Sequence, residues 1–171
     1  LKIPFMPRRS KLETDFEHLD AFIGISFHLR DYRLVFDINK ALGLALAKTE
    51  DLPVFNTRTQ SMSEYSCYTS TDSDTLLTYF LLANAGIDGL MLPQQKQADF
   101  FLLIKGKGGG EMEDKLVEQI KNLPNVLTAF TIDQEKTTNV ETLISDLELH
   151  ELNLKIISRD TNFEEENTDN L

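Results

Sequence analysis

Apolar residues along the chain fall into short blocks, and the first two blocks predict a strand followed by a helix. Residues 20–27 read DAFIGISF, a run of β-branched and aromatic residues that is typical of a strand. The next block repeats apolar residues at helical spacing and predicts a helix over residues 31–43. Its apolar positions are Leu34, Val35, Ile38 and Leu42. Asp31 is expected to cap the start of this helix, and Gly43 to end it.

The middle of the chain alternates polar and apolar residues. SEYSCYT, residues 63–69, predicts one half-exposed strand that pairs with a segment near residues 54–58. TSTDSD, residues 69–74, predicts a turn. Two strongly apolar runs, residues 75–84 and 98–105, then predict buried strands.

Residues 111–124 predict a second amphipathic helix, and residues 125–133 predict the last strand of the core. The apolar face of the helix is formed by Met112, Leu116, Ile120 and Leu123. Pro124 and Asn125 are expected to end it, because proline cannot continue a helix.

The C-terminal part has a different pattern. Thr138 and Glu141 stand at capping-box spacing, and a helical stripe follows over residues 140–147. Leu152, Leu154 and Ile156 alternate as in a short strand. We therefore divide the chain into four parts: an N-terminal arm at 1–12, a core domain at 13–133, an amphipathic extension at 134–157 and an acidic, disordered tail at 158–171.

The order of these elements indicates an α+β fold. Strand, helix, two to three strands, helix and strand predict a two-layer sandwich, with a mostly antiparallel sheet and helices on one face. The final strand–helix–strand unit, residues 98–132, has the order found in ferredoxin-like and ACT-like domains.

Charge and composition exclude several classes of protein. The net charge of −11 repels phosphate backbones and anionic lipid, so we expect neither a nucleic acid nor a membrane partner. The single cysteine, Cys67, cannot form an internal disulfide, which favours a reducing, cytoplasmic location. The longest apolar stretch, residues 75–92, is interrupted by Asn84, Gly86, Asp88 and Gly89, so it does not predict a membrane helix.

Four glycines cluster around a lysine at residues 106–110, directly after a predicted strand. The spacing does not match a phosphate-binding loop, because both the Walker pattern and the dinucleotide pattern place a required residue at Glu111. Glu113 and Asp114 would also repel phosphate at the start of the helix. We expect a plain strand-to-helix connection and no cofactor.

One stretch resembles a known family. LPQQKQADF, residues 92–100, is similar to the string that names the IPExxxVDY family of uncharacterised proteins of the Bacteroidota. The residues that carry the resemblance are Leu92, Pro93, Gln94, Ala98, Asp99 and Phe100. Residues 24–46 also look like the first strand and helix of this family, and the resemblance spans residues 11–133.

The resemblance implies a lineage and a cytosolic location, but no activity. Where the motif has glutamate and tyrosine, this chain has Gln94 and Phe100, and neither can transfer a proton. We therefore interpret the motif as structural. Pro93 would fix the chain that enters the strand, Asp99 would accept backbone N–H groups, and Phe100 would pack in the core.

Candidate chemistry is sparse. GISFH, residues 24–28, lacks the second glycine of a nucleophile elbow, so Ser26 is expected on a strand. The three histidines and Cys67 show no metal-ligand spacing, so no metal is expected. Arg30 and Arg33 could hold a carboxylate or phosphate ligand, or could pair with surface acids. Asp99 is a further candidate ligand-binding residue.

The sequence therefore predicts a non-enzymatic binding or regulatory module for a protein partner or a small ligand. The alternatives are a small enzyme with a cleft built from Arg33, His28 and Asp99, and a structural subunit of a larger assembly. The apolar stripe at residues 140–156 either packs on the sheet or forms a homodimer or partner interface.

Overall fold

The structure of the chain is a computed structural model that describes residues 18–106 and 110–168. The strands are β1 (Ala21–Ser26), β2 (Ala47–Lys48), β3 (Leu52–Asn56), β4 (Ser61–Tyr65), β5 (Cys67–Thr71), β6 (Thr78–Ala83), β7 (Ala85–Gly86), β8 (Gly89–Leu90), β9 (Phe100–Lys105) and β10 (Thr128–Thr131). The helices are α1 (Asp31–Leu42), α2 (Glu113–Lys121) and α3 (Val140–Thr168), with short 3₁₀ turns η1 (Pro93–Gln95) and η2 (Gly110–Met112). The predicted N-terminal arm at 1–12 lies outside the described residues.

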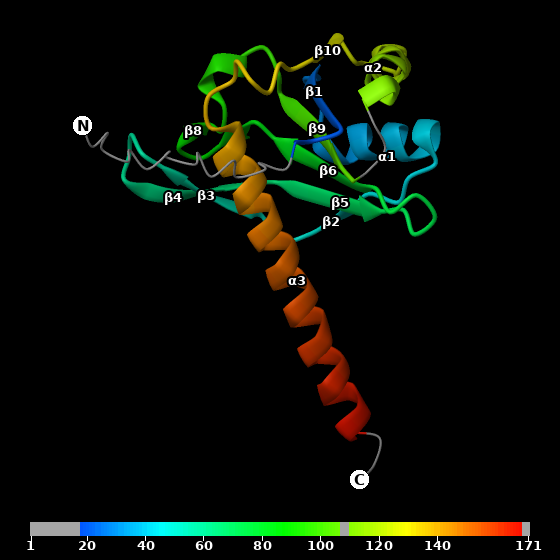
Figure 1. The fold of residues 1–171 in the computed structure, drawn as a ribbon, viewed down its shortest axis with the longest axis vertical. Helices are drawn as coiled ribbons and strands as arrows, with labels where there is room; N and C mark the ends of the chain where they lie inside the picture. Colours follow the sequence, from blue (N-terminus) through cyan, green and yellow to red (C-terminus); the bar gives the residue numbers. More distant parts are fainter. Residues whose placement is uncertain (1–17, 107–109, 169–171) are drawn as a thin grey trace, which may run out of the picture.

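Six strands form an antiparallel sheet in the order β10-β1-β9-β6-β5-β2 (Figure 1). β1 pairs with both β9 and β10, so these two strands run in the same direction, and α2 connects them. β9 lies between β1 and β6, which are therefore also parallel to each other. The prediction of an α+β fold with a mostly antiparallel sheet is confirmed.

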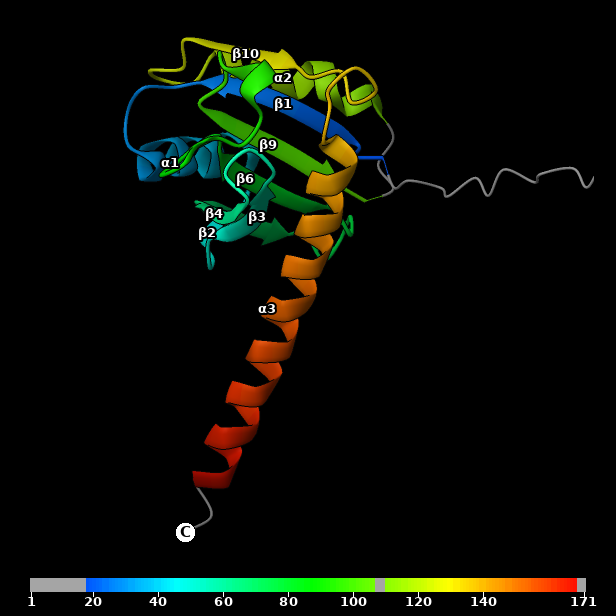
Figure 2. The same cartoon turned by 90° about the vertical axis from the view of Figure 1, so that its left-hand side faces the viewer.

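Both faces of the sheet are covered, which corrects the expectation of two layers with helices on one face. On one face, Ile23 and Leu102 pack with residues of α1 and α2. On the other face, Phe22 and Phe101 pack with the first turns of α3 and with the β3–β4 hairpin. Figure 2 shows α1 and α3 on opposite sides of the central strands. The physical reason is that β1 and β9 are apolar at nearly every position, so each needs cover on both faces.

The start and end of α1 follow local chemistry. Gly43 adopts φ 66° and its N–H bonds to the carbonyl of Asn39, as expected for a left-handed C-cap. Asp31 is the first helical residue and Arg30 the N-cap, so the predicted cap is off by one residue. The Asp31 carboxylate is turned to other partners, described below.

The predicted single strand at 63–69 is two strands. Ser66 separates β4, which pairs with β3, from β5, which pairs with β2 and β6. The alternation of buried Tyr65 and Cys67 with the partly buried Ser66 continues across the break, so alternation alone does not reveal it.

α3 differs most from the expectation. Leu152, Leu154 and Ile156 lie in this helix, so the predicted short strand is wrong. A run of three alternating apolar residues also fits a helix, where Leu152 and Ile156 share one face. The helix continues through most of the stretch predicted as a disordered tail and ends at Thr168, while residues 169–171 lie outside the described part. None of the helices that the structure describes is both long enough and apolar enough to cross a membrane.

Candidate functional site

The resemblance motif forms a loop that is built around one buried amide. Asn84, at the end of β6, has no exposed surface. Its side-chain N–H groups donate to the carbonyls of Gln95 (3.1 Å) and Ala98 (2.9 Å), and its Oδ1 accepts the N–H of Leu92 (2.9 Å). Three backbone groups of the motif are thus satisfied by one side chain, which gives this loop a structural role. Sequence reasoning missed Asn84, since it took this residue for a break in an apolar run.

Gln94 and Gln95 of the same loop hold the turn that leads into α3. The side chain of Gln94 accepts the N–H of Thr138 (3.2 Å), and that of Gln95 donates to the Thr137 hydroxyl (3.3 Å). Pro93 is the first residue of η1, a position where its missing N–H costs nothing. Gln94 therefore makes this contact as a neutral amide, and the contact does not require the glutamate of the motif.

Asp99 ties the start of β9 to the end of β1. Its Oδ2 accepts the N–H of Phe27 (2.8 Å) and the hydroxyl of Ser26 (3.3 Å), and lies 3.6 Å from Nε2 of His28. The expectation that Asp99 accepts a backbone N–H is met. Phe100 is buried and its ring meets that of Phe27 edge-on at 6.3 Å.

The arrangement of Ser26, His28 and Asp99 is not that of a catalytic triad. A triad places the histidine between the serine and the carboxylate, whereas here the carboxylate lies between the other two. Within the described part of the chain, no hydrogen bond joins Ser26 to His28. Ser26 is also buried, while the His28 side chain is 69% exposed.

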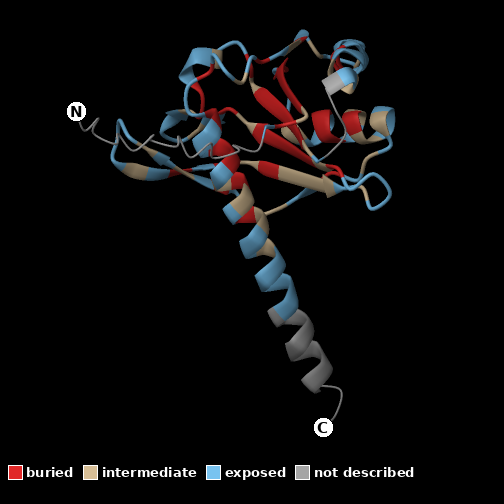
Figure 3. Ribbon diagram, in the orientation of Figure 1, coloured by how far each residue is buried: buried red, intermediate tan, exposed pale blue. Residues whose placement is uncertain are grey.

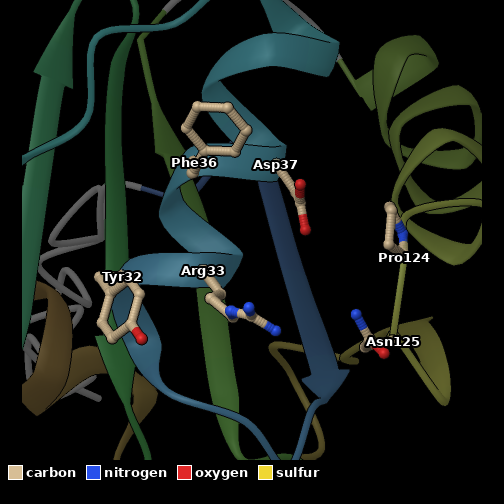
Figure 4. Close-up of a pocket in the computed structure, with 6 residues that line it drawn as sticks. All are labelled: Tyr32, Arg33, Phe36, Asp37, Pro124 and Asn125. Carbon is tan, nitrogen blue, oxygen red and sulfur yellow. The ribbon is translucent and has the colours of Figure 1, made fainter.

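Arg33 lies in a different place, on an open groove of about 530 Å³ between α1 and the turn that follows α2. Its lining residues are Tyr32, Arg33, Phe36, Asp37, Pro124 and Asn125. Figure 4 shows Arg33 and Asp37 extending from α1 toward the side of Pro124 and Asn125. The structure thus brings His28 and Asp99 together, but it places Arg33 in a separate groove. Arg30 precedes this helix and is exposed.

A second groove, of about 460 Å³, lies between the β3–β4 hairpin, the β7–β8 turn and the start of α3. Arg58, Tyr65, Asp88 and Asn139 line it together with apolar side chains, among them motif residues Leu92 and Pro93. Burial raises the pKa of the Tyr65 phenol, and the nearby Asp88 carboxylate adds to this rise. Gly86 allows the Tyr65 ring to lie here, because a Cβ on this glycine would come within 2.8 Å of the ring.

A polar cluster joins α1 to β5. Asp31 Oδ2 accepts the Tyr68 hydroxyl at 2.8 Å, and Lys48 Nζ donates to the Ser66 hydroxyl at 2.8 Å. Burial, together with the hydrogen bond to Asp31, raises the pKa of Tyr68 to about 12. Lys48 is also paired with the Asp51 carboxylate. This cluster anchors the helix.

Other candidates carry little chemistry. Burial raises the pKa of the Cys67 thiol, which makes it a poor nucleophile. Among the described residues, no three His, Cys, Asp or Glu side chains could hold a metal ion. Gly106 is held against Leu77, since a Cβ there would lie 2.4 Å from that side chain. The rest of the glycine cluster falls mainly on residues 107–109, which lie outside the described residues.

No family model, no curated protein and no solved structure matches this chain. The resemblance to the IPExxxVDY family stays a prediction that rests on the motif residues.

Proposed function

We propose that the chain is a non-enzymatic binding module that recognises a protein partner through the outer side of α1. The observation that carries this proposal is a pair of large, exposed aromatic side chains, Tyr32 and Phe36, that line the groove of Figure 4. Tyr32 is 62% exposed and Phe36 66%. Together with Arg33 we call these residues the α1 surface. Exposed apolar side chains gathered in one place mark interaction sites.

The chemistry of the α1 surface supports a protein partner over a small ligand. Tyrosine and arginine are the residues that contribute most to protein interfaces. The rings of Tyr32 and Phe36 lie largely in solvent, whereas a small-molecule site buries most of its ligand. A flat or open surface of this kind suits the side chains of another protein.

Charge indicates which partner fits. Arg30, Arg33 and Lys40 lie on or beside the exposed side of α1, with Asp37 among them. None of these four is in an ion pair with another described residue. Asp31, the other acidic residue of α1, is bonded to Tyr68 and Ser66. On a chain of net charge −11, this basic patch favours a partner segment with acidic residues around an apolar anchor.

Three further expectations belong to the same proposal. The strand order β10-β1-β9-β6 with α1 and α2 in the connections supports a ferredoxin-like core. The motif residues support a lineage shared with the IPExxxVDY family, and the single buried Cys67 supports a cytoplasmic location. The enzyme alternative requires Arg33 to lie beside His28 and Asp99. Arg33 instead lines a separate groove, which favours a binding module over an enzyme.

Site-specific photo-crosslinking in the native host tests the proposal. A benzoylphenylalanine replaces Phe36 in one variant and Phe55 in another, because Phe55 is also exposed, at 52%, but lies on the β3–β4 hairpin. We expect one defined protein adduct from position 36, and its loss when Arg33→Glu is added. The proposal is wrong if position 36 gives no adduct, or if Arg33→Glu leaves the adduct unchanged.

A further inference from the structure

The two edges of the six-stranded sheet differ in their protection against further strand pairing. β2 forms one edge, and it is only two residues long and carries Lys48. Short length and a lysine are both features that keep another strand from a sheet edge. β10 forms the other edge, and Figures 1 and 2 both place it at the margin of the molecule. Residues 125–132, NVLTAFTI, contain no charged residue and no proline, so the β10 edge lacks these protections.

The pairing of β10 with β1 shows which backbone groups of β10 point outward. The carbonyls of Phe22 and Ser26 accept N–H groups from the β10 side, at 2.7 and 2.9 Å. Every second residue of β1 therefore directs its backbone groups toward β10, and the residue opposite Phe130 is one of them. The N–H and C=O groups of Ala129 and Thr131, on either side of Phe130, then point to the outer edge. In the part of the chain that the structure describes, no strand pairs with this side of β10.

The outer edge of β10 has the form of a surface that accepts a strand. Outward N–H and C=O groups on alternate residues are satisfied by the backbone of an added β-strand. Thr128 and Thr131 are exposed, and threonine and phenylalanine favour strand pairing. In Figure 3 the buried residues are concentrated in the central strands, and the margin at β10 is largely exposed or partly buried. The backbone pattern therefore selects an extended segment as the occupant.

The segment that leads into β10 also forms one wall of the groove beside α1. Pro124 and Asn125 line this groove, and Figure 4 shows them across from Tyr32 and Phe36. β10 begins at Thr128, three residues after Asn125, which is about 10 Å of extended chain. An extended segment longer than β10 can therefore pair with the edge and follow this wall to the α1 surface.

Length favours another protein over a second copy of the chain. β10 has four residues, so a contact between two β10 strands would be only about 13 Å long. The second copy could not continue as a strand to the groove, because its chain turns after β10. In this turn the side chain of Gln134 donates to the carbonyl of Leu19 (2.9 Å) and accepts its N–H (3.0 Å). One short strand pair falls well below the roughly 1,200 Å² that a stable interface buries.

We propose that the partner of the α1 surface adds an extended strand to the outer edge of β10. The proposal rests on the proposed function, since the α1 surface supplies the rest of the interface. Hydrogen exchange of single amides, measured by NMR on the purified full chain, tests whether the edge is free. The amides of Ala129 and Thr131 should exchange at least about tenfold faster than that of Phe130, which faces β1. Equal protection of the three amides would mean that the edge is already covered, and would overturn the proposal.

Photo-crosslinking in the native host tests for the added strand. Benzoylphenylalanine replaces Thr128 in one variant and Phe36 in another, and we expect an adduct with the same protein from both. Thr131→Pro removes an outward N–H and leaves the pairing with β1 intact, because an edge strand accepts proline where its N–H faces solvent. This change should abolish the adduct at position 128. The matched control Thr131→Val keeps the N–H and should leave the adduct unchanged, and circular dichroism verifies that both variants are folded.

The outcomes distinguish this proposal from the proposed function. An adduct at position 36 without one at 128 would overturn strand addition and leave the α1 surface as the binding site. An adduct at 128 alone, or at neither position, would contradict the α1 surface and with it the shared interface. Strand addition is also wrong if the adduct at 128 persists in the folded Thr131→Pro variant, or if it joins two copies of this chain. If Thr131→Pro does not fold, amide exchange and the adduct at 128 still decide.

Discussion

At the scale of single residues, Asn84 is the side chain on which the motif loop depends most. It is fully buried and satisfies backbone groups of Leu92, Gln95 and Ala98. Asn84→Ala would leave these groups buried without partners, and each such group costs about 1–3 kcal/mol. We expect the free energy of unfolding, measured by urea denaturation, to fall by at least about 3 kcal/mol.

Asn153→Ala is the matched control for this change, because Asn153 is an exposed asparagine on α3. Its effect should stay within about 0.5 kcal/mol, as for most surface positions. A loss at Asn84 no larger than the loss at Asn153 would contradict the structural role given to the loop.

Burial of the Asp146 carboxyl on α3 makes the stability of the fold depend on pH. Its Oδ2 is buried and has no hydrogen-bond partner among the residues that the structure describes, and burial raises the pKa of this carboxyl above its usual range. A folded-state pKa above the unfolded value means that stability is highest below the unfolded pKa and falls as pH rises through the folded pKa. The charged form is therefore disfavoured in the folded protein at neutral pH.

Asp146→Asn removes this charge, so we expect the variant to unfold at higher urea concentration than the wild type at pH 7. The difference should shrink below about pH 4, where Asp146 is protonated in both states. Glu141→Gln, an exposed position at the start of the same helix, should show no such pH-dependent gain. A difference at Asp146 that stays constant with pH would exclude burial of the charge as its cause.

At the scale of secondary structure, periodicity predicted those elements whose apolar pattern has a single explanation. β1, α1, β9, α2 and β10 lie within a few residues of their predicted ranges, since each has a run or stripe that fits one structure only. The alternation at Leu152, Leu154 and Ile156 fits both a strand and a helix, and the structure has the helix. The side chains on which the motif depends, above all Asn84, are polar residues whose partners are remote in sequence, so no local pattern reveals them.

α3 should behave as two segments in hydrogen exchange. The segment up to His150 packs on the domain, whereas the segment after it makes few contacts with the domain. We expect amides at 143–150 to be protected and amides beyond about residue 155 to exchange far faster, as frayed helices do. Mass spectrometry of peptic peptides locates the boundary. Uniform protection along α3 in the isolated chain would mean that the second segment is stabilised by something other than a partner.

At the scale of the whole molecule, the C-terminal segment is part of the core. Sequence alone left open whether the stripe at 140–156 packs on the sheet or binds a partner. The structure shows that one side of the helix packs on the sheet, while Leu149, Leu152 and Ile156 remain exposed. The uninterrupted apolar run of β9 was the available signal for a third layer, because a strand with one solvated face alternates. What that layer consists of depends on long-range packing, which periodicity does not report.

Two truncations separate the contribution of the packed first turns of α3 from that of its exposed second half. Deletion of residues 134–171 removes the first turns of α3 and uncovers Phe22, Phe101 and Leu103, each of which contributes about 1.5–3 kcal/mol when buried. We expect this variant to be insoluble, or to lose more than about 10 °C in Tm. Deletion of residues 152–171 keeps the packed turns, so its Tm should stay within a few degrees of the full chain. If the longer deletion leaves Tm unchanged, α3 is not a layer of the core. If the shorter deletion lowers Tm as much as the longer one, the exposed half of α3 stabilises the domain directly, and its apolar stripe needs no partner to explain it.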